Sequence, residues 1–442
     1  MKTVVLGGGI SGIAAAWRLR QAGASVTLLE ARAHLGGRLV SHEALDLPTP
    51  FDNGPHLFLS SYTRARRLFR ELGIDTHFEY PYPGAIPFIR KDGWRGRLQE
   101  WPLPAPLNFA GGLLGFSMLS RAARRRAFKA ARDLVGQAPD WQWDAGQWLK
   151  AHSGSEERAL LWEPLIRAAM NASPEEIPAQ NLRTVIKQGF CHGLFGGRLG
   201  YAKKPLGEIF GGQAHSALKQ AGIEVRLKAA AVVLICESDA IKGIALQSGE
   251  VFAGEVVVAA LPPWALADWL KDTPAGERII SEYRLRDWRA NPITSIYFWG
   301  EDRPLLDGYT CLPGRRAEWV FDFARLWGDM RAPLGVILND AANSEWAEPL
   351  KGLRYAAPLQ SILNELISAF PQLGPVRWTA WKQVTEKRAT PLRPRALWGK
   401  TLPQEMPIRG LYLAGDWLDS ELPPTVEAGV RAGENVKKWI MQ

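Results

Sequence analysis

Cysteine is scarce in this sequence. The three cysteines, Cys191, Cys236 and Cys311, are scattered through 442 residues, and none belongs to a C-x-x-C pair. This spacing argues against a disulfide framework and against a cysteine-based metal site, so we expect three buried or partly buried thiols. The seven histidines form no H-E-x-x-H pattern or related cluster, and no metal site is predicted.

Long apolar runs are also missing. No uninterrupted apolar stretch reaches the roughly 18 residues that a membrane-spanning helix needs. The chain enters a strand pattern at once, without the basic segment, apolar core and cleavage site of a secretory leader. We therefore expect a cytoplasmic location. If the protein contacts lipid, we expect that contact to be peripheral, on the inner face of the membrane.

The charge balance is positive, with 54 Lys and Arg against 45 Asp and Glu and a net charge of +9. This balance fits an anionic partner. Arginines are spread along the chain and no nucleic-acid-binding module is recognisable, so a membrane surface or an anionic small molecule is favoured over nucleic acid. The length predicts roughly two domains.

The N-terminus carries the strongest local signal. The pattern predicts a buried strand over residues 3–6, a glycine-rich turn over 7–12, a helix over 14–19 and a strand over 26–29, followed by Glu30. A G-x-G-x-x-G turn between a strand and a helix, with an acid about 20 residues on, is the fingerprint of dinucleotide binding. Its glycines permit the tight turn, the approach of the pyrophosphate and close helix packing, and the helix N-terminus favours phosphate.

The residues after Glu30 favour one dinucleotide. Ala31-Arg32 and Leu35-Gly36-Gly37-Arg38 resemble the continuation found in the amine oxidase and phytoene desaturase superfamily of FAD enzymes. The resemblance implies FAD, with the glycine pair beside the cofactor and Arg38 near its phosphates.

The C-terminal region completes this resemblance. A strand over 410–414 runs into Gly415-Asp416, and residues 423–430 open a final helix. The resemblance places Asp416 on a ribityl hydroxyl and the helix N-terminus at the flavin, where its dipole stabilises the negative charge of the reduced ring. It also places the strand over 231–235 beside the adenine, with Ala231 to Val233 as the candidates for the contact and Val232 as the residue predicted.

These signals predict an α/β fold. A Rossmann-type FAD-binding domain would be assembled from the discontinuous segments 1–80, 200–264 and 391–442. An α+β substrate-binding domain would comprise 81–199 and 265–390. Alternating runs over 292–299, 318–323, 334–338 and 376–382 predict antiparallel strands in that domain.

Four further motifs narrow the family. They are D-N-G-x-H at Asp52–His56 (with Pro55 in place of Gln), W-E-P-L at Trp162–Leu165, E-K-R-A-T at Glu386–Thr390, and A-G-D-W…L-P-x-T at Ala414–Thr425. They resemble the squalene-associated, FAD-dependent, desaturase-like family that includes the hydroxysqualene dehydroxylases. The resemblance implies reductive removal of a hydroxyl from hydroxysqualene, giving squalene in hopanoid and triterpenoid biosynthesis, with hydride from flavin N5. The E-K-R-A-T segment either reaches the flavin or forms a plain surface turn.

Such a reaction needs a general acid, because an allylic-type C–O bond ionises more easily once the hydroxyl is protonated. We predict His56 as that acid, with Asp52 of the same loop beside it. Glu163, Asp419 and Glu421 are held in reserve, and an ion pair or a helix start is the alternative role for Glu163. The candidate cofactor-binding residues are Gly7, Gly9, Ser11, Gly12, Glu30, Ala31, Gly37, Arg38, Asn53, Gly54, Val232, Gly415, Asp416, Thr425, Val426 and Glu427.

Residues 107–135 suggest contact with lipid. An apolar stretch over 107–119 is too short to cross a bilayer and precedes a predicted helix with a broad basic arc. This combination suits a protein resting on anionic lipid. The alternative is a buried helix followed by a helix with one solvated face.

No second G-x-G-x-x-G occurs, so an external electron donor is expected beside the polyisoprenoid lipid substrate. Three other functions stay open at this point. They are a carotenoid-type desaturase or isomerase on the same scaffold, an amine oxidase, and an FAD-containing partner of a terpenoid complex without turnover.

Overall fold

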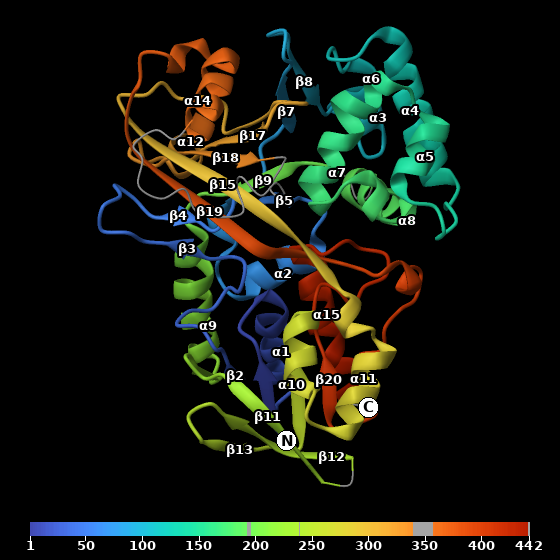
Figure 1. The fold of residues 1–442 in the computed structure, drawn as a ribbon, viewed down its shortest axis with the longest axis vertical. Coiled ribbons are helices and arrows are strands. Elements are labelled where there is room, and N and C mark those ends of the chain that lie inside the picture. Colours follow the sequence, from blue (N-terminus) through green and yellow to red (C-terminus); the bar gives the residue numbers. More distant parts are fainter. Residues whose placement is uncertain (192–195, 238, 339–356, 441–442) are drawn as a thin grey trace.

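The computed structural model describes residues 1–191, 196–237, 239–338 and 357–440. Figure 1 shows two halves joined near α2 (Thr63–Glu71), with both chain ends in the lower half. Each half is organised around one sheet, and the lower sheet carries the glycine-rich turn.

The lower half is a parallel sheet in the order β10-β2-β1-β14-β20. Its strands are β1 (Lys2–Leu6), β2 (Ser25–Leu29), β10 (Glu224–Arg226), β14 (Val256–Ala259) and β20 (Leu411–Leu413). Segments distant in sequence therefore meet in one sheet, and the strands expected over 3–6, 26–29 and 410–414 are present. The α/β flavoprotein fold predicted from the sequence is confirmed.

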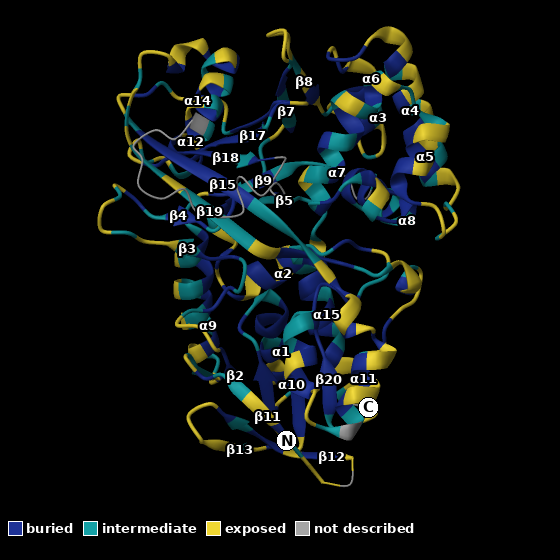
Figure 2. Ribbon diagram, in the orientation of Figure 1, coloured by how far each residue is buried: buried dark blue, intermediate teal, exposed yellow. Residues whose placement is uncertain are grey.

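Helices α1 (Ile10–Gln21) and α15 (Val426–Ile440) pack against each other beside this sheet. Glycine makes the contact close, because a Cβ at Gly433 would collide with the backbone oxygen of Ser11. Figure 2 shows α1 and the strands around it as the most buried part of this half. The remaining helices here are α9 (His215–Gln220), α10 (Pro263–Leu270) and α11 (Pro274–Glu282).

The strand expected over 231–235 exists as β11 (Ala231–Glu237), but it lies outside the parallel sheet. It forms a small antiparallel sheet with β12 (Ala240–Leu246) and β13 (Val251–Ala253). Cys236 on β11 is exposed, so the expectation that all three thiols are at least partly buried is wrong for this residue.

The upper half is built on a seven-stranded sheet in the order β19-β15-β18-β17-β16-β7-β8. Its strands are β7 (Ala85–Ile89), β8 (Arg95–Gln99), β15 (Arg289–Glu301), β16 (Tyr309–Cys311), β17 (Ala317–Asp322), β18 (Leu334–Leu338) and β19 (Arg377–Leu392). The four strands expected here are present and antiparallel. The Glu386–Thr390 segment lies within β19, so its interpretation as a surface turn is wrong. In Figure 1, β15 and β19 run together from the upper half toward the lower one.

Smaller elements connect the halves and cover the upper sheet. The short strands are β3 (Ser41–His42), β4 (Phe51–Asp52), β5 (Leu57–Leu59), β6 (Phe78–Glu79) and β9 (Leu199–Ala202). The upper helices are α3 (Leu107–Gly115), α4 (Arg121–Gly136), α5 (Ala145–His152), α6 (Ser155–Glu157), α7 (Glu163–Met170), α8 (Ala179–Thr184), α12 (Phe323–Trp327) and α14 (Ala357–Ala369). π-helical segments occupy Arg158–Trp162, Val185–Phe190 and Gly207–Ala214, and single 3₁₀ turns occupy Asp75–His77, Pro174–Glu176, Leu285–Asp287, Pro371–Leu373 and Arg395–Leu397. Among the described residues, no helix combines the length and the apolar character needed to cross a membrane.

Candidate active site

One cavity of about 1120 Å³ extends from the glycine-rich turn into the upper half. Its lower wall includes Gly7, Gly9, Ser11, Glu30, Ala31, Gly37, Arg38, Gly415, Asp416, Thr425 and Val426. Its upper wall includes Ile86, Leu165, Val185, Phe190, Leu199, Trp319, Phe321 and Ile337. The predicted cofactor site and an apolar chamber therefore share one continuous space.

The glycine-rich turn borders the cavity where α1 begins. A Cβ at Gly9 would find only the Gly37 Cα near it, at 3.9 Å, so the space above Gly9 is open to a pyrophosphate. A Cβ at Gly12 would instead collide with the carbonyl oxygen of Gly7. Gly12 does not line the cavity, and its role is the close packing of helix on strand.

We expect Gly12→Ala to lower the free energy of unfolding by about 1–3 kcal/mol, because the new methyl group must displace backbone. Chemical denaturation at saturating flavin measures the change. Gly136→Ala is the matched control, since a Cβ there meets nothing within 4 Å. Equal destabilisation in both variants would contradict the packing role.

Glu30 is fixed at the end of β2. Its carboxylate accepts hydrogen bonds from the backbone N–H of Gly8 at 2.6 Å and of Arg32 at 2.7 Å. It lines the cavity, where a carboxylate can accept hydrogen bonds from ribose hydroxyls. Next to Glu30 the cavity wall contains Ala229, Ala230 and Ala231, and the Ala229 N–H donates to the Glu30 carbonyl at 2.9 Å. Val232, predicted at this position, is 45% exposed and outside the cavity wall.

Arg38 joins three distant segments at the cavity. Its guanidinium forms an ion pair with Asp416 and donates to the Ala389 carbonyl at 2.7 Å. The N-terminus of α15 follows, with Thr425 and Val426 in the wall. Helix N-termini and an arginine around an open turn form a donor set that fits the phosphates and flavin of FAD.

Glu427 does not share this role. Its carboxylate accepts hydrogen bonds from the backbone N–H of Arg64 at 3.1 Å and of Ala65 at 2.9 Å, in the first turn of α2. It lies outside the cavity wall. The structure therefore gives the Glu427 carboxylate a helix-capping position, and the predicted cofactor contact of this residue stays a prediction.

The loop 53–56 lies in the cavity wall, with Asn53, Gly54 and His56 all lining it. His56 places Nδ1 at 2.8 Å from the Gly54 carbonyl oxygen. Because that oxygen can only accept, Nδ1 carries a proton and Nε2 is the basic nitrogen. Burial lowers the pKa of His56, and the charge of Arg38 lowers it further.

Asp52 is buried behind this loop and does not line the cavity. Its carboxylate accepts from Ser41 Oγ at 2.6 Å and from the Leu206 N–H at 2.9 Å. Burial raises the pKa of Asp52 to about 7. These contacts give Asp52 the position of a loop anchor, and its catalytic role stays a prediction.

The reserve acids also lie outside the cavity wall. Glu163 lies in the first turn of α7, and its Oε2 is 3.6 Å from Nη1 of Arg167. Asp419 accepts hydrogen bonds from the N–H groups of Glu421 and Leu422 at 2.9 and 3.0 Å, and Glu421 is exposed. The reserve role of these three residues as acids stays a prediction.

Sequence reasoning missed two charged residues of the chamber, Arg167 and Glu318, which line the cavity as a pair. Two signals could have found them. Arg167 lies one helical turn after Glu163, and Glu318 is the one acid before Asp322 in an otherwise apolar strand.

Residues 386–391 of β19 also line the cavity. At this wall, Asn53 Nδ2 donates a hydrogen bond to Glu386 at 3.2 Å.

Comparison with known proteins agrees with this geometry. Residues 10–436 match the family model described as flavin containing amine oxidoreductase. A hydroxysqualene dehydroxylase of Rhodopseudomonas palustris is 27% identical, covering 100% of this chain and 98% of that protein. A 15-cis-phytoene desaturase of Glycine max is 24% identical, and the match covers 100% of this chain and 80% of that protein. Cyclohexylamine oxidase from Brevibacterium oxydans has a similar fold, with a TM-score of 0.69, 18% identity and coverage of 99% and 98%.

Proposed function

We propose that this chain, which belongs to the flavin-containing amine oxidoreductase family and is an FAD-dependent oxidoreductase, acts on hydroxysqualene. In the proposed reaction it removes the hydroxyl group reductively and gives squalene. The observation that carries the proposal is one continuous cavity, which joins the predicted FAD site to an apolar chamber. A C30 hydrocarbon chain needs such a chamber, and full-length relatives carry this activity in their names.

The division of labour in this proposal follows the two sheets. Segments 1–80, 200–264 and 391–442 bind FAD, and segments 81–199 and 265–390 bind the lipid. When bound and reduced, FAD supplies the hydride that replaces the hydroxyl. The side chains around the chamber exclude water, which would otherwise capture the carbocation left when the C–O bond ionises.

In this reaction the protein must deliver one proton. The C–O bond breaks as its oxygen takes that proton and leaves as water, and a C–H bond forms at the same carbon. We propose His56 as the acid, because among the described residues that line the cavity it is the one histidine. An external donor must return two electrons to the enzyme after each turnover.

An anaerobic experiment tests the function directly. The purified flavoprotein is photoreduced, hydroxysqualene is added, and flavin absorbance is followed while extracted lipid is analysed. Reoxidation with one squalene formed per flavin is the expected result. Reduced flavin that persists without squalene would reject the proposal and favour the desaturase alternative. The match to a phytoene desaturase over the whole of this chain and 80% of that protein keeps this alternative open. The next test would then be oxidised enzyme with a polyisoprenoid that has bonds left to desaturate.

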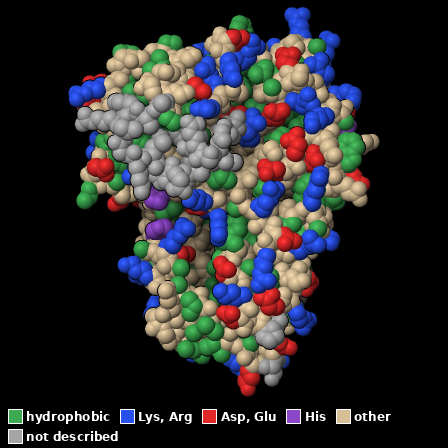
Figure 3. All heavy atoms as spheres, viewed as in Figure 1, with side chains coloured by type: hydrophobic (Ala, Val, Ile, Leu, Met, Phe, Trp, Pro, Cys, Tyr) green, Lys and Arg blue, Asp and Glu red, His purple; other side chains and the backbone are tan. Residues whose placement is uncertain are grey.

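We also propose that α3 and the loop before it rest on anionic lipid. Four large apolar side chains there are exposed, Trp101 (47%), Leu103 (42%), Leu107 (57%) and Leu114 (43%). A small cavity between α3 and β7–β8 shares Ile86, Phe190 and Leu199 with the main chamber, so α3 lies close to that chamber. Figure 3 shows Lys and Arg side chains around this upper part of the molecule.

Fewer basic side chains of α4 are available to lipid than the sequence suggests, because several of them are paired with acidic residues. Arg126 is paired with Glu157 at 2.8 Å, and Lys129 and Arg132 both contact Asp133. The buried face of Ala123, Ala127, Ala130 and Leu134 is present as expected. Among the described contacts, Arg121 and Arg125 have no ion-pair partner, so they are the charges most available to lipid phosphate.

Replacing Leu107 and Leu114 together with Asp should reduce binding to vesicles that contain anionic lipid by at least about tenfold, because each buried leucine contributes about 2 kcal/mol. Liposome flotation measures the bound fraction. Val251→Asp is the control, since Val251 is 58% exposed on β13 at the opposite end. Unchanged flotation of the double variant would favour the solvated-helix alternative.

A further inference from the structure

A charged pair lies in the wall of the apolar chamber. Arg167 of α7 donates from Nε and Nη2 to the two carboxylate oxygens of Glu318 on β17, at 2.8 and 2.6 Å. The Glu318 side chain is 2% exposed and that of Arg167 is 23% exposed. Both residues line the cavity together with Leu165, Phe190 and Trp319.

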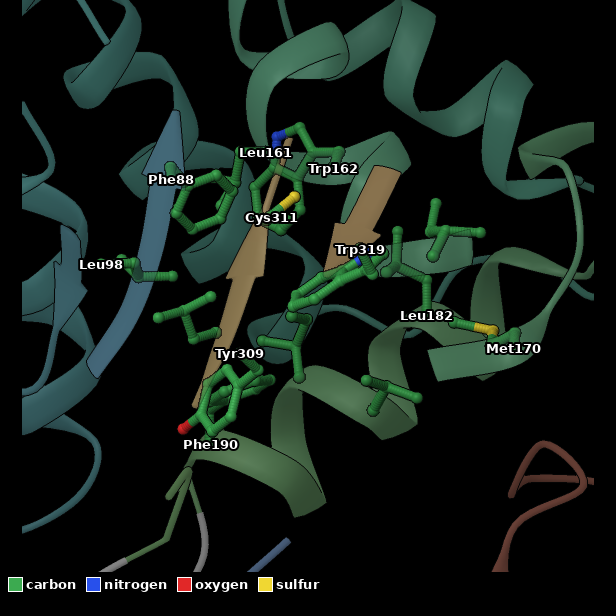
Figure 4. Close-up of a cluster of buried hydrophobic side chains, with 14 of the residues drawn as sticks. Phe88, Leu98, Leu161, Trp162, Met170, Leu182, Phe190, Tyr309, Cys311 and Trp319 are labelled. Carbon is green, nitrogen blue, oxygen red and sulfur yellow. The ribbon is translucent and has the colours of Figure 1, made fainter. Parts of the chain in front are cut away.

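The surroundings of this pair are apolar. Figure 4 shows Trp319, next to Glu318 in the chain, among the labelled side chains of Trp162, Cys311 and Leu182. These residues belong to one buried hydrophobic cluster. Desolvation of an ion pair in such a place offsets most of its attraction, and apolar side chains of similar volume would stabilise the fold as well or better. Stability alone therefore does not account for the pair.

The guanidinium keeps one nitrogen available. Nε and Nη2 are used by Glu318, whereas the described contact of Nη1 is an ion-pair approach of 3.6 Å to Glu163 Oε2. That separation is too long for a hydrogen bond. Nη1 therefore carries hydrogens that Glu318 does not take up, on a residue that lines the cavity.

Helix α7 places this donor close to the cofactor side. Asn171 lies one turn after Arg167, and its Nδ2 donates to Thr390 Oγ1 at 3.2 Å. Thr390 follows Ala389, whose carbonyl accepts from Arg38 at 2.7 Å. Arg167 is thus one helical turn from Asn171, whose partner Thr390 is next in the chain to the residue that binds Arg38.

We propose that Arg167, held in place by Glu318, donates a hydrogen bond to the oxygen of the substrate and so selects an oxygenated polyisoprenoid over a pure hydrocarbon. This inference rests on the proposed function and adds a specificity-determining residue to it. The guanidinium remains charged throughout, so it orients the hydroxyl while the proton comes from another group. Squalene has no oxygen and cannot accept this hydrogen bond, so the product would be bound more weakly than the substrate and would dissociate.

The test compares two ligands that differ by this oxygen. Dissociation constants of hydroxysqualene and squalene are measured on oxidised holoenzyme by perturbation of the flavin spectrum. A hydrogen bond to a charged group contributes about 1.5–3 kcal/mol, so wild type should prefer hydroxysqualene about 10- to 100-fold and Arg167→Met should lose that preference. The Kd for squalene should stay within about threefold.

Two further variants separate recognition from folding. Arg167→Met removes the guanidinium that Glu318 binds, so a second variant that combines Arg167→Met with Glu318→Leu restores an apolar wall. This double variant should show the same loss of preference. Arg377→Met is the control, because its ion pair with Glu301 lies on the surface at 3.3 Å. It should bind both ligands as wild type does.

The outcomes are distinct. If wild type turns over hydroxysqualene and prefers it, but the double variant keeps that preference, the inference fails and the proposed function stands. Equal weakening of both ligands by every Arg167 variant would show a structural role and also overturn the inference. If wild type shows no preference and no turnover, the proposed function fails with it.

Discussion

Gly9→Leu should yield a folded protein that has lost its FAD. The Gly9 backbone has a φ of −72° that any residue can adopt, and the protein leaves free space where the side chain would extend. That space is the cavity beside the N-terminus of α1, where the pyrophosphate must come close to the backbone. A leucine there fills the phosphate position without straining the fold.

We expect flavin affinity to fall at least about 100-fold, because the side chain displaces the pyrophosphate from the N–H groups and dipole of α1. The flavin-to-protein absorbance ratio after gel filtration, together with a titration of added FAD, measures the loss. Gly136→Leu is the control, since its side chain would enter open space at the end of α4. A yellow Gly9→Leu protein with unchanged affinity would place the cofactor elsewhere.

Local motifs predicted the strands and helices of the lower half well, and the reason is physical. The turn at Gly7–Gly12, the acid at Glu30 and the Gly415-Asp416 turn each depend on a strand running directly into a loop. Spacing along the chain records such an arrangement. The order β10-β2-β1-β14-β20 then brings these turns to one edge, because the carboxyl ends of parallel strands meet there.

Spacing alone could not tell which way each side chain points. Glu427 belongs to the same motif as Val426, yet its carboxylate turns away to cap α2. Asp52 belongs to the same loop as His56, yet it is buried behind that loop. Such differences arise from the packing of α2 and of residues near Ser41, which no short pattern contains.

The chamber was harder to predict for a second reason. Arg167 and Glu318 come from an α-helix and a strand of the upper half, and only the folded sheet brings them together. An isolated acid in an apolar strand signals a buried partner, but the sequence does not identify that partner. The same limit applies to Asn171, whose contacts lie on β15 and β19.

Replacing His56 with Gln should reduce kcat by about 100-fold or more while FAD remains bound, because general acid catalysis typically contributes 10²- to 10⁴-fold. Glutamine keeps a hydrogen-bonding side chain but cannot release a proton. Rapid-mixing measurement of flavin reoxidation by hydroxysqualene gives the rate. His215→Gln is the matched control, since burial also lowers the pKa of His215 but that residue does not line the cavity.

The pH dependence gives the sharper test of this assignment. Burial and the charge of Arg38 both disfavour the imidazolium, so the pKa of His56 lies below its ordinary value of 6.5. The form that can donate a proton is therefore lost as pH rises through a pKa below 6.5. Wild-type kcat should fall about tenfold per pH unit above that point, and His56→Gln should give a flat profile.

Asp52 supplies the competing explanation, because its pKa is raised to about 7. A protonated Asp52 would also be lost with rising pH, but its rate loss would be centred near 7 and would persist in His56→Gln. Asp52→Asn removes that titration while preserving an acceptor for the Ser41 hydroxyl and the Leu206 N–H. If the loss survives in His56→Gln and disappears in Asp52→Asn, the proton originates behind the loop, and His56 is at most the path by which it reaches the cavity.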